Sequence, residues 1–446
     1  MYSFLYNIWG LFTSQILYPY AEHKIKRQIL PKLRILRQEA KLPFSVRRAA
    51  TLERLASTLK AAGSDVPYYR DMFRAIGFNP EKISNDIRYI NDIPYLTKEI
   101  LREQGIRLVS EKYISRIIRE QKTGSSTGPA AIIRYDQESL DWTAAQNILM
   151  LEWGGKYRWN REAHLSTQFT TPLSPQSLKN EARKCLVLNR YNIYTGGFDD
   201  ASQEQLLSDL HTAHANVVQG HPSSMFALAR YLKSQGKTGK DLFSLFISTG
   251  EMLTQSQRAL IEEVFGVRVS NRYGACEFGV MAQERATGPK GELMVSDSLV
   301  WPELLPYREK GIGELVFTAL RNPCMPLIRY RMGDLGTLEE RQDGWWITQL
   351  TGRTHDVVKI NGKNYPTHFI QDIFDRCGNI TDFQVAVTPE GEALEFRLVT
   401  PPESWDSISL AVRREFPSVP ARRIDAKELV FIGIRGKFSY LVRITT

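Results

Sequence analysis

Small and hydroxyl-bearing residues crowd one short stretch of the chain. Residues 122–130 read KTGSSTGPA, so two glycines, two serines and two threonines lie between Thr123 and Gly128. Small residues let backbone N–H groups approach an anion closely, and hydroxyl groups add donors for phosphate oxygens. The spacing does not match G-x-x-x-x-G-K-[ST], which disfavours a nucleoside triphosphatase of that class. Taken alone, the stretch is more typical of a surface turn than of a phosphate-binding loop.

Further segments with charged and aromatic residues follow along the chain. Glu277 and Asp334 offer carboxylates and Lys437 offers a cation, and each has an ordinary structural explanation when taken alone. A surface ion pair, a turn aspartate and a solvated basic tail would account for them. Their order and spacing nevertheless form a pattern, which runs through STGE (248–251), YGACE (273–277), GELVFTALRNPCMPLIRYRMGD (313–334), GRTHDVVKING (352–362) and RGKFSY (435–440).

In this order and spacing, the segments resemble those of the adenylate-forming superfamily, which contains acyl-CoA synthetases, peptide-synthetase adenylation domains and luciferases. Within it, the chain is most similar to the phenylacetate–CoA ligase-like branch, including relatives associated with capsular polysaccharide synthesis. The resemblance extends from about residue 50 to about residue 440. Three more segments are typical of that branch, namely VPYYRDMF (66–73), IPYLTKEIL (93–101) and GHPSS (220–224).

The resemblance implies a two-step ligase reaction that uses ATP, Mg²⁺ and, as the first expectation, CoA. The family joins a small-molecule carboxylic acid to ATP, which gives an acyl-adenylate and pyrophosphate. Positive groups must then face the negative charge that develops at the α-phosphate. Two alternatives stay open: transfer of the acid to an amine or hydroxyl group in surface polysaccharide biosynthesis, and a non-catalytic nucleotide-binding relative. The intact set of charged motif residues argues against the second.

The resemblance also assigns nucleotide-binding roles. The loop would hold the β- and γ-phosphates, the ring of Tyr273 would stack on adenine, and Asp334 would accept the ribose hydroxyl groups. The predicted ATP- and AMP-binding residues are Thr123, Gly124, Ser125, Ser126, Thr127, Gly128, Gly250, Glu251, Tyr273, Gly274, Asp334 and Arg353.

Three residues receive catalytic roles from the resemblance. Glu277 matches the magnesium ligand, and Mg²⁺ is commonly held by one or two carboxylates together with phosphate oxygens. Arg353 matches an arginine that contacts ribose and phosphate. Lys437 matches a mobile lysine that bridges the α-phosphate and the substrate carboxylate. Family members rotate a small C-terminal domain between the two steps, and His355 stands at the expected hinge.

The acid is expected to bind between the segment that follows residue 220 and the segments around Ser248 and Ala275. His221, Ser223, Ser248 and Ala275 are the candidates for the substrate pocket. An aryl acid would favour an apolar slot with few polar groups, whereas an amino or hydroxy acid would need a polar partner. The sequence alone does not select the acid, the acceptor or the oligomeric state.

The elements that must position these residues change character along the chain. Residues 1–115 are predicted to be mainly helical, because their apolar positions recur at helical spacing. From about residue 116, short β-rich runs alternate with helices, which predicts a layered α/β fold. A shorter α/β unit follows after about residue 350. We therefore expect a large N-terminal domain over 1–352, a small mobile C-terminal domain over 353–446 and a hinge near 353–356.

Composition sets outer limits on these interpretations. Of 446 residues, 42% are hydrophobic and 24% are charged, which excludes collagen-like and wholly disordered chains. The four cysteines form no C-x-x-C pair, so a disulfide scaffold and a cysteine-rich zinc site are disfavoured and a cytoplasmic location is expected. The net charge of +9 suits polyanionic ligands such as ATP and CoA. No nucleic-acid recognition motif accompanies it, so we expect no nucleic-acid partner.

The N-terminus leaves two interpretations open. Residues 1–21 hold no charged side chain and are followed by EHKIKR. Positive charge after the apolar run argues against a signal peptide, and polar residues within the run argue against a membrane-spanning helix. A helix packed on the main domain is the first expectation. The alternative is a helix peripheral to the inner membrane face, with Trp9, Phe12 and Tyr18 near lipid headgroups and basic residues near anionic lipid.

Overall fold

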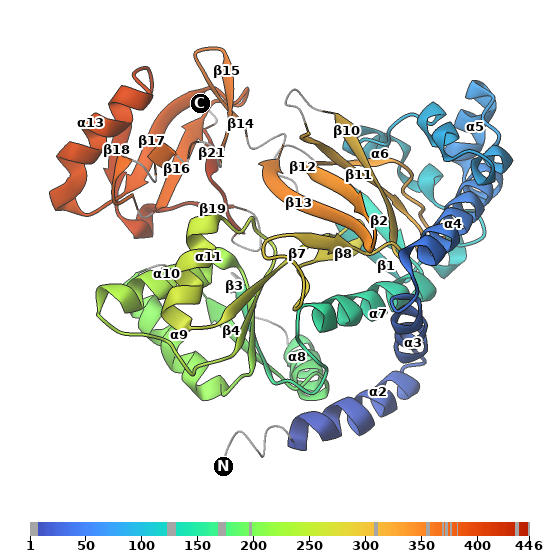
Figure 1. Cartoon of the computed structure of the whole chain (residues 1–446), viewed down its shortest axis with the longest axis horizontal. Coiled ribbons are helices and arrows are strands. Elements are labelled where there is room, and N and C mark those ends of the chain that lie inside the picture. The colour runs from blue at the N-terminus through green and yellow to red at the C-terminus, as the bar shows by residue number, and fades with distance from the viewer. Residues whose placement is uncertain are drawn as a thin grey trace.

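A long mixed sheet runs through the body of the molecule, and a separate four-stranded sheet lies at its C-terminal end (Figure 1). The computed structural model describes residues 8–122, 131–167, 175–195, 199–306, 311–353, 357–432 and 437–444, apart from 368, 369, 371, 372, 375, 376 and 381. The mixed α/β architecture confirms the fold class predicted from the sequence.

A helical region precedes the large sheet in the chain. Residues 8–24 form one continuous helical segment, in which a π-helical stretch (Thr13–Leu17) leads into α2 (Tyr18–Lys24). The longer helices that follow are α3 (Ile29–Glu39), α4 (Phe44–Asp65), α5 (Pro67–Ile76) and α6 (Lys98–Gln104).

Helix α5 shows how local sequence sets these boundaries. Pro67 stands in the first turn, where a missing N–H group has no intrahelical partner to lose. Gly77 ends the helix with φ of 65°, a left-handed conformation that glycine adopts without strain. Tyr69 and Phe73 lie one turn apart on the buried side of the helix. Their burial against the large sheet ties the helical region to the rest of the body.

The large sheet contains 11 strands in the order β10-β11-β12-β13-β9-β8-β7-β6-β5-β3-β4. Neighbours from β7 to β4 pair in parallel, and neighbours from β10 to β7 pair antiparallel. The strands are β3 (Glu162–Thr167), β4 (Arg190–Thr195), β5 (Val217–Gly220), β6 (Leu245–Ser248), β7 (Arg268–Ala275), β8 (Gly279–Gln283), β9 (Leu293–Val295), β10 (Val300–Pro306), β11 (Gly313–Ala319), β12 (Tyr330–Arg341) and β13 (Gly344–Arg353).

Helices connect and cover the parallel half of the sheet, as crossover connections between parallel strands require. They are α8 (Pro175–Val187), α9 (Asp200–Ala213), α10 (Pro222–Ser234) and α11 (Gln255–Phe265). Strand β6, with the sequence LFIS, is buried at all four positions because helices cover both of its faces. Thr254 caps α11 through a capping box with Gln257, as its position in the sequence predicts.

Helix α7 (Gln137–Trp153) follows the hairpin of β1 (Arg119–Lys122) and β2 (Ile132–Tyr135) and packs on the N-terminal helix α3. An aspartate on α7 holds the residues that lead into α3. Asp141 accepts a hydrogen bond from Arg27 through one oxygen and from the backbone N–H of Gln28 through the other, at 2.8 Å. The N-terminal helices are therefore fixed to the same helix that lies over the functional motifs.

The C-terminal sheet has the strand order β18-β17-β16-β21 and is built from β16 (Asp382–Val387), β17 (Ala393–Val399), β18 (Ala421–Ile424) and β21 (Leu441–Arg443). Helix α13 (Trp405–Glu415) packs on it, and two short hairpins accompany it, β14 (Val357–Ile360) with β15 (Lys363–Pro366) and β19 (Phe431–Ile432) with β20 (Lys437–Phe438). Its apolar core centres on Phe374 and is separate from the cores of the large sheet. We call residues 357–444 the C-terminal unit.

A partly buried ion pair joins the C-terminal unit to the helices of the large sheet. Arg230 of α10 contacts Asp382, the first residue of β16, with 2.8 Å between Nη1 and Oδ2. Burial raises the pKa of the Asp382 carboxyl above its usual range, and the nearby Arg230 charge opposes that rise. Figure 1 shows the C-terminal unit above α10 and α11.

Candidate active site

The motif segments meet at the carboxyl ends of three neighbouring parallel strands. Gly220 ends β5 and lies opposite Ser248, which ends β6, and Ser248 lies in turn opposite Asn271 of β7. Loops that leave the carboxyl ends of parallel strands converge on one edge of the sheet, which is the usual ligand site of such folds. His221, Gly250 and Tyr273 are thereby brought to the same edge although they are far apart in the sequence.

Gly250 lets the loop after β6 pass close to His221. Its φ of 84° lies in the left-handed region, and a Cβ atom there would stand 2.9 Å from the His221 ring. The Glu251 carboxylate then reaches the start of α10: its Oε1 lies 3.8 Å from Nδ1 of His221, and its Oε2 accepts a hydrogen bond from the backbone N–H of Ser223 at 3.4 Å. Three of the predicted residues are thus in direct contact.

The hydroxyl group of Tyr273 donates a hydrogen bond to Oδ2 of Asp334 at 2.6 Å. Tyr273 lies in β7 and Asp334 in β12, and three strands separate these two in the sheet order. Four strand spacings would separate them by about 19 Å in a flat sheet. The antiparallel half must therefore curve strongly, and this curvature brings an aromatic ring and a carboxylate together.

The chain bends just before Asp334. Gly333 has a φ of 75°, and its N–H donates to Oε1 of Glu314 at 3.0 Å, while Arg331 pairs with Oε2 of the same carboxylate. The pairing of β11 with β12 shifts register in this region, so the Asp334 carboxylate is carried out of the regular ladder. The backbone of Arg353 in β13 lies directly opposite Asp334.

Glu277 follows β7 in a turn and is half-buried. Its Oε1 accepts a hydrogen bond from the Tyr330 hydroxyl at 3.3 Å, and its Oε2 accepts one from the Cys276 thiol at 3.1 Å. Burial, and then the negative charge of Glu277, raise the pKa of Tyr330 above its usual range, so this hydroxyl stays protonated as a donor. A fixed carboxylate with free lone pairs suits Mg²⁺, which takes few protein ligands.

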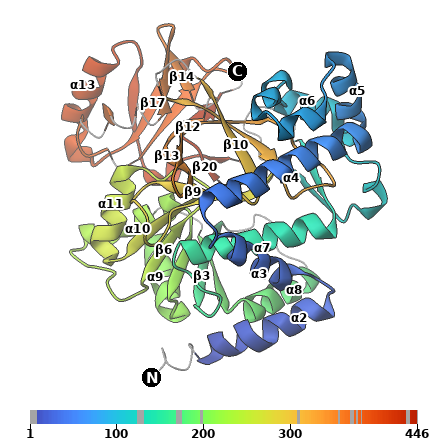
Figure 2. The same cartoon turned by 45° about the vertical axis from the view of Figure 1, so that its right-hand side comes forward.

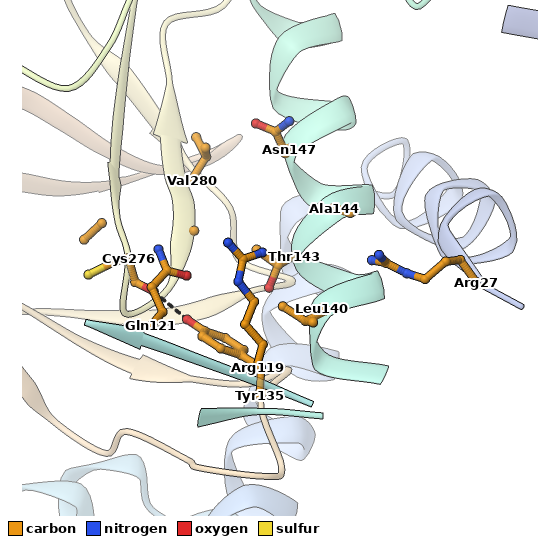
Figure 3. A pocket seen from close by; sticks show the side chains of 12 residues that line it. Arg27, Arg119, Gln121, Tyr135, Leu140, Thr143, Ala144, Asn147, Cys276 and Val280 are labelled. Carbon is orange, nitrogen blue, oxygen red and sulfur yellow. Dashed lines mark hydrogen bonds between the residues drawn. The ribbon is translucent and has the colours of Figure 1, made fainter. Parts of the chain in front are cut away.

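A cavity of about 360 Å³ lies beside the turn that contains Cys276 and Glu277 (Figure 3). It is lined by α7, by the hairpin of β1 and β2, and by strands β7 and β8. Helix α7 contributes the wall that Figure 3 labels with Leu140, Thr143, Ala144 and Asn147. The Tyr135 hydroxyl closes the floor by donating to the Cys276 carbonyl at 2.5 Å. The remaining lining residues are Arg27, Arg119, Gln121, Ala275, Cys276, Gly279 and Val280.

A buried arginine lies behind the α7 wall of this cavity. Arg272 of β7 donates to the side-chain oxygen of Asn147, and its Nε has no hydrogen-bond partner among the described residues. No carboxylate forms an ion pair with it within that part of the chain, and burial lowers its pKa to about 10. The cavity therefore borders a buried positive charge that Glu162 offsets only from beyond ion-pair distance.

The structure brings six of the predicted residues into two contact groups. Tyr273, Glu277 and Asp334 lie near one another, and His221, Ser223 and Glu251 form a second contact group next to Gly250. Of the residues expected to line the acid pocket, Ala275 lies on the cavity wall, whereas Ser248 is buried and its hydroxyl has no partner among the described residues. Outside the described residues lie Thr123–Gly128 and His355, and for Arg353 and Lys437 the backbone alone is described.

Sequence reasoning missed several residues that shape the site. Tyr330 stood within a quoted motif but received no role, although it holds Glu277. Arg272 directly precedes the YGACE segment, and a charged residue inside a strand of the sheet was a usable signal. Asn147 carried no signal, because only packing of α7 brings it to Arg272, 125 residues away. Within the described ranges, no group of three or more His, Cys, Asp or Glu side chains is placed to hold a metal ion.

Curated relatives of the chain include phenylacetate–coenzyme A ligases and a protein named CapK. No family model matches the chain. A phenylacetate–coenzyme A ligase of Pseudomonas putida is 29% identical over 354 residues, which covers 73% of this chain and 75% of that protein. Protein CapK of Staphylococcus aureus is 22% identical over 307 residues, covering 68% of this chain and 66% of CapK.

Solved structures show the same fold. A 2-hydroxyisobutyryl-CoA ligase in its postadenylation state, in complex with an acyl-AMP, matches with a TM-score of 0.71 at 17% identity over 91% of each chain. The same ligase in its thioesterification state matches with a TM-score of 0.59 at 18% identity and the same coverage. These likenesses show that this chain has the overall fold of that ligase.

Proposed function

Since the chain belongs to the adenylate-forming superfamily, in its phenylacetate–CoA ligase-like branch, we propose that it is an ATP-dependent ligase that activates a carboxylic acid and transfers it to CoA. The observation that carries this proposal is the hydrogen bond between Tyr273 and Asp334 with Glu277 beside it. An aromatic ring, a carboxylate for ribose hydroxyls and a carboxylate for a metal–phosphate group are what an adenylating site must contain.

In the first half-reaction, a carboxylate oxygen of the acid attacks the α-phosphorus of ATP. The bond between the α-phosphorus and the oxygen that bridges to the β-phosphate breaks, and pyrophosphate leaves. Tyr273 would stack on adenine while Asp334 holds the ribose, so the α-phosphate is presented toward the cavity beside Glu277. Arg353 and Lys437 would face the charge that develops on the phosphate, where fixed positive groups contribute most.

In the second half-reaction, the sulfur of CoA attacks the acyl carbonyl carbon, the bond to the AMP phosphate oxygen breaks, and the thiol proton passes to solvent. We propose that the predicted C-terminal domain, residues 353–446, which contains the C-terminal unit, rotates between the two steps about residues 353–356 near His355. Support comes from its separate core and from the postadenylation and thioesterification states in which a ligase of this fold has been solved. The predicted phosphate loop, Thr123–Gly128, would hold the departing pyrophosphate.

Glu277 is the residue that fits a magnesium ion. Its carboxylate is held by Tyr330 and Cys276 but keeps lone pairs for a cation, and a single carboxylate with phosphate oxygens is a common magnesium site. Bound Mg²⁺ would neutralise phosphate charge and stabilise the pyrophosphate leaving group.

The cavity lining indicates what kind of acid would fit. Leu140, Ala144 and Val280 offer apolar walls, whereas Arg119 and Asn147 offer hydrogen-bond donors, and Arg272 adds a positive charge behind Asn147. We therefore expect an acid with an apolar body and a hydrogen-bond acceptor or second negative group at a distance from the reacting carboxylate. His221 and Ser223, which the sequence predicts for the acid pocket, do not line this cavity.

A second candidate acceptor is an amine or hydroxyl group in surface polysaccharide biosynthesis, and the likeness to CapK supports it. We propose a cytoplasmic location for either acceptor, since ATP is available on that side of the membrane. A non-catalytic nucleotide-binding role is the remaining alternative. The retained Glu277, Asp334, Arg353 and Lys437 argue against it.

Exchange of labelled pyrophosphate into ATP, measured against a panel of aryl, fatty, amino and uronic acids, tests the first half-reaction. At least one acid should support exchange, and Glu277→Gln should reduce its rate by roughly 10²-fold or more. Glu390→Gln, at an exposed position of the C-terminal unit, is the matched control and should leave the rate unchanged. ATP binding without exchange for any acid would contradict the ligase proposal. Adding CoA or an amine to preformed adenylate then identifies the acceptor.

A further inference from the structure

The helical segment 8–24 presents its polar side to the protein and its apolar side to solvent. Its buried positions are Gly10, Thr13, Ser14 and Glu22. A surface helix of a globular protein normally buries its apolar stripe and exposes its charged face. This segment is reversed, and Figure 2 shows it along the lower edge of the molecule, below α8 and far from the C-terminal unit.

Polar contacts hold the inner side in place. A Cβ atom at Gly10 would stand 2.0 Å from the carbonyl oxygen of Trp159, so glycine permits the helix to touch this backbone. Arg158 donates to the carbonyl of Ser14, and Oε1 of Glu22 accepts the N–H of Leu30 at 2.8 Å. The segment is therefore seated in a defined orientation.

Tyr18 also faces inward, contrary to the alternative that placed it near lipid headgroups. The guanidinium group of Arg158 lies 4.7 Å from the centre of its ring. Burial, followed by the charge of Glu22, raises the pKa of Tyr18 to about 12. The orientation of the segment is thus opposite to what a lipid-facing Tyr18 would need, and other aromatic residues point outward.

An apolar stripe runs along the outer side, formed by Ile8, Phe12, Ile16 and Tyr20, which are 50%, 43%, 58% and 61% exposed. Residues four apart drift by about 40° on an ideal α-helix. The π-helical stretch Thr13–Leu17 holds more residues per turn and opposes that drift, so the four side chains stay aligned.

The apolar surface continues around this stripe. Trp9 and Leu11 are exposed beside it, and Trp9 lies against Phe12 with ring centres 5.4 Å apart. Tyr157 and Trp159 are exposed next to the buried Gly10 and stack on one another at 4.7 Å. Contiguous exposed apolar surface of this kind marks an interaction site rather than ordinary surface.

The charges around the stripe select the partner. Residues 1–21 contain no Asp or Glu, and the exposed Lys24 and Lys26 follow directly. Neither lysine forms an ion pair within the described part of the chain. Aromatic and aliphatic side chains flanked by free lysines match the interface of an anionic bilayer, where acyl chains lie beneath negative headgroups.

We propose that the segment 8–24 docks the enzyme, lying flat, on an anionic membrane surface. This goes beyond the ligase activity and does not depend on it. No helix among the described residues is long and apolar enough to cross a bilayer, which agrees with flat docking. Arg27, which follows the segment, lies on the wall of the cavity beside Glu277, so a docked enzyme would hold that cavity close to the membrane.

Flotation of the full chain with phosphatidylcholine vesicles, with and without phosphatidylglycerol, tests this proposal. Binding should need phosphatidylglycerol and should fall as salt is raised, because the lysine contribution is screened. Each lysine near such a surface strengthens binding roughly fivefold, so Lys24→Glu with Lys26→Glu should weaken it by about 25-fold or more. The matched control reverses the charge of two exposed lysines elsewhere, Lys237→Glu with Lys240→Glu. It should weaken vesicle binding far less.

The stripe is tested by replacing its four residues with serine in one variant. This variant should lose flotation altogether while keeping its thermal unfolding temperature and its pyrophosphate exchange rate. Serine at four other exposed apolar positions is the control and should keep flotation: Ile76, Ile106, Leu394 and Leu410. If the stripe variant floats like the unaltered chain, the proposal is overturned.

A second copy of the chain is the competing occupant of the stripe. Light scattering after size-exclusion chromatography distinguishes it, because a stripe-mediated dimer would become a monomer in the stripe variant. A dimer that does not float with phosphatidylglycerol vesicles would overturn the membrane proposal. Pyrophosphate exchange without flotation would contradict membrane docking alone. Flotation without exchange would contradict the ligase function alone.

Discussion

The large sheet and the C-terminal unit place their functional groups in different ways. In the large sheet, Tyr273, Asp334 and Glu277 are each held by a side-chain hydrogen bond within one curved framework. In the C-terminal unit, Lys437 lies in a hairpin of two-residue strands, paired opposite Ile432. The unit has its own core, and a partly buried ion pair connects it to α10. The groups that we propose to bind nucleotide thus belong to one framework, while the lysine that would act on it lies on the part that we propose to move.

This difference suits a ligase with two half-reactions. The nucleotide and the acyl-adenylate must stay in place between the steps, whereas the group that assists adenylation must give way to the acceptor. Conformational steps of this kind need an interface that is strong enough to hold one state but weak enough to exchange. Among the described residues, one ion pair spans the interface, which meets that requirement better than a shared apolar core would.

Removal of the lysine should give the largest effect. Lys437→Ala should slow adenylation by roughly 10²–10³-fold, because one positioned positive donor is lost from the developing charge. Thioester formation from supplied acyl-adenylate should stay within a few-fold of the unaltered rate. Single-turnover assays of the two half-reactions measure both, and Lys427→Ala, at an exposed lysine of the same unit, is the control. Equal losses in both steps would contradict a role confined to adenylation.

Damage to the separate core should unfold one region without the other. Phe374 is buried and makes edge-to-face contacts with Phe383 and Phe396, with ring centres 4.9 and 5.1 Å apart. Phe374→Ala should destabilise the C-terminal unit by about 3–5 kcal/mol, since a large cavity would remain. Calorimetry should show one transition lowered and a second one nearly unchanged, and ATP should still bind. A single transition that shifts as a whole would show that the two regions unfold together.

Loss of the ion pair should give the smallest effect and the most informative one. Arg230→Ala and Asp382→Ala should each favour thioester formation over adenylation by roughly fivefold, as expected from about 1 kcal/mol of coupling. The double variant should add little beyond either single variant. Lys233→Ala breaks an exposed pair with Glu263 on the same helix and should leave the ratio of the two rates unchanged. Additive effects of the two substitutions would mean that the pair does not couple the regions.

Much of the fold was predictable because helices and strands follow local patterns. The helical region before residue 115, the alternation of short strands with helices after residue 116 and the small α/β unit after residue 350 lie where their local patterns place them. Strand β19 of the C-terminal unit is described over Phe431–Ile432. Short strands at the margin of a fold depend on their partner for pairing, so sequence periodicity gives them weak support.

The sequence by itself determined which residues carry chemistry, because each motif is a short contiguous segment whose residue types are set by the group it would bind. The tertiary structure alone decided the distances between motifs and the partners of buried charges. Tyr273 meets Asp334 because the sheet curves, and Arg272 meets Asn147 because α7 packs over β8, the neighbour of β7. It also decided which side of the helical segment 8–24 faces solvent, because Arg158 and the backbone of Leu30 satisfy polar groups on its inner side.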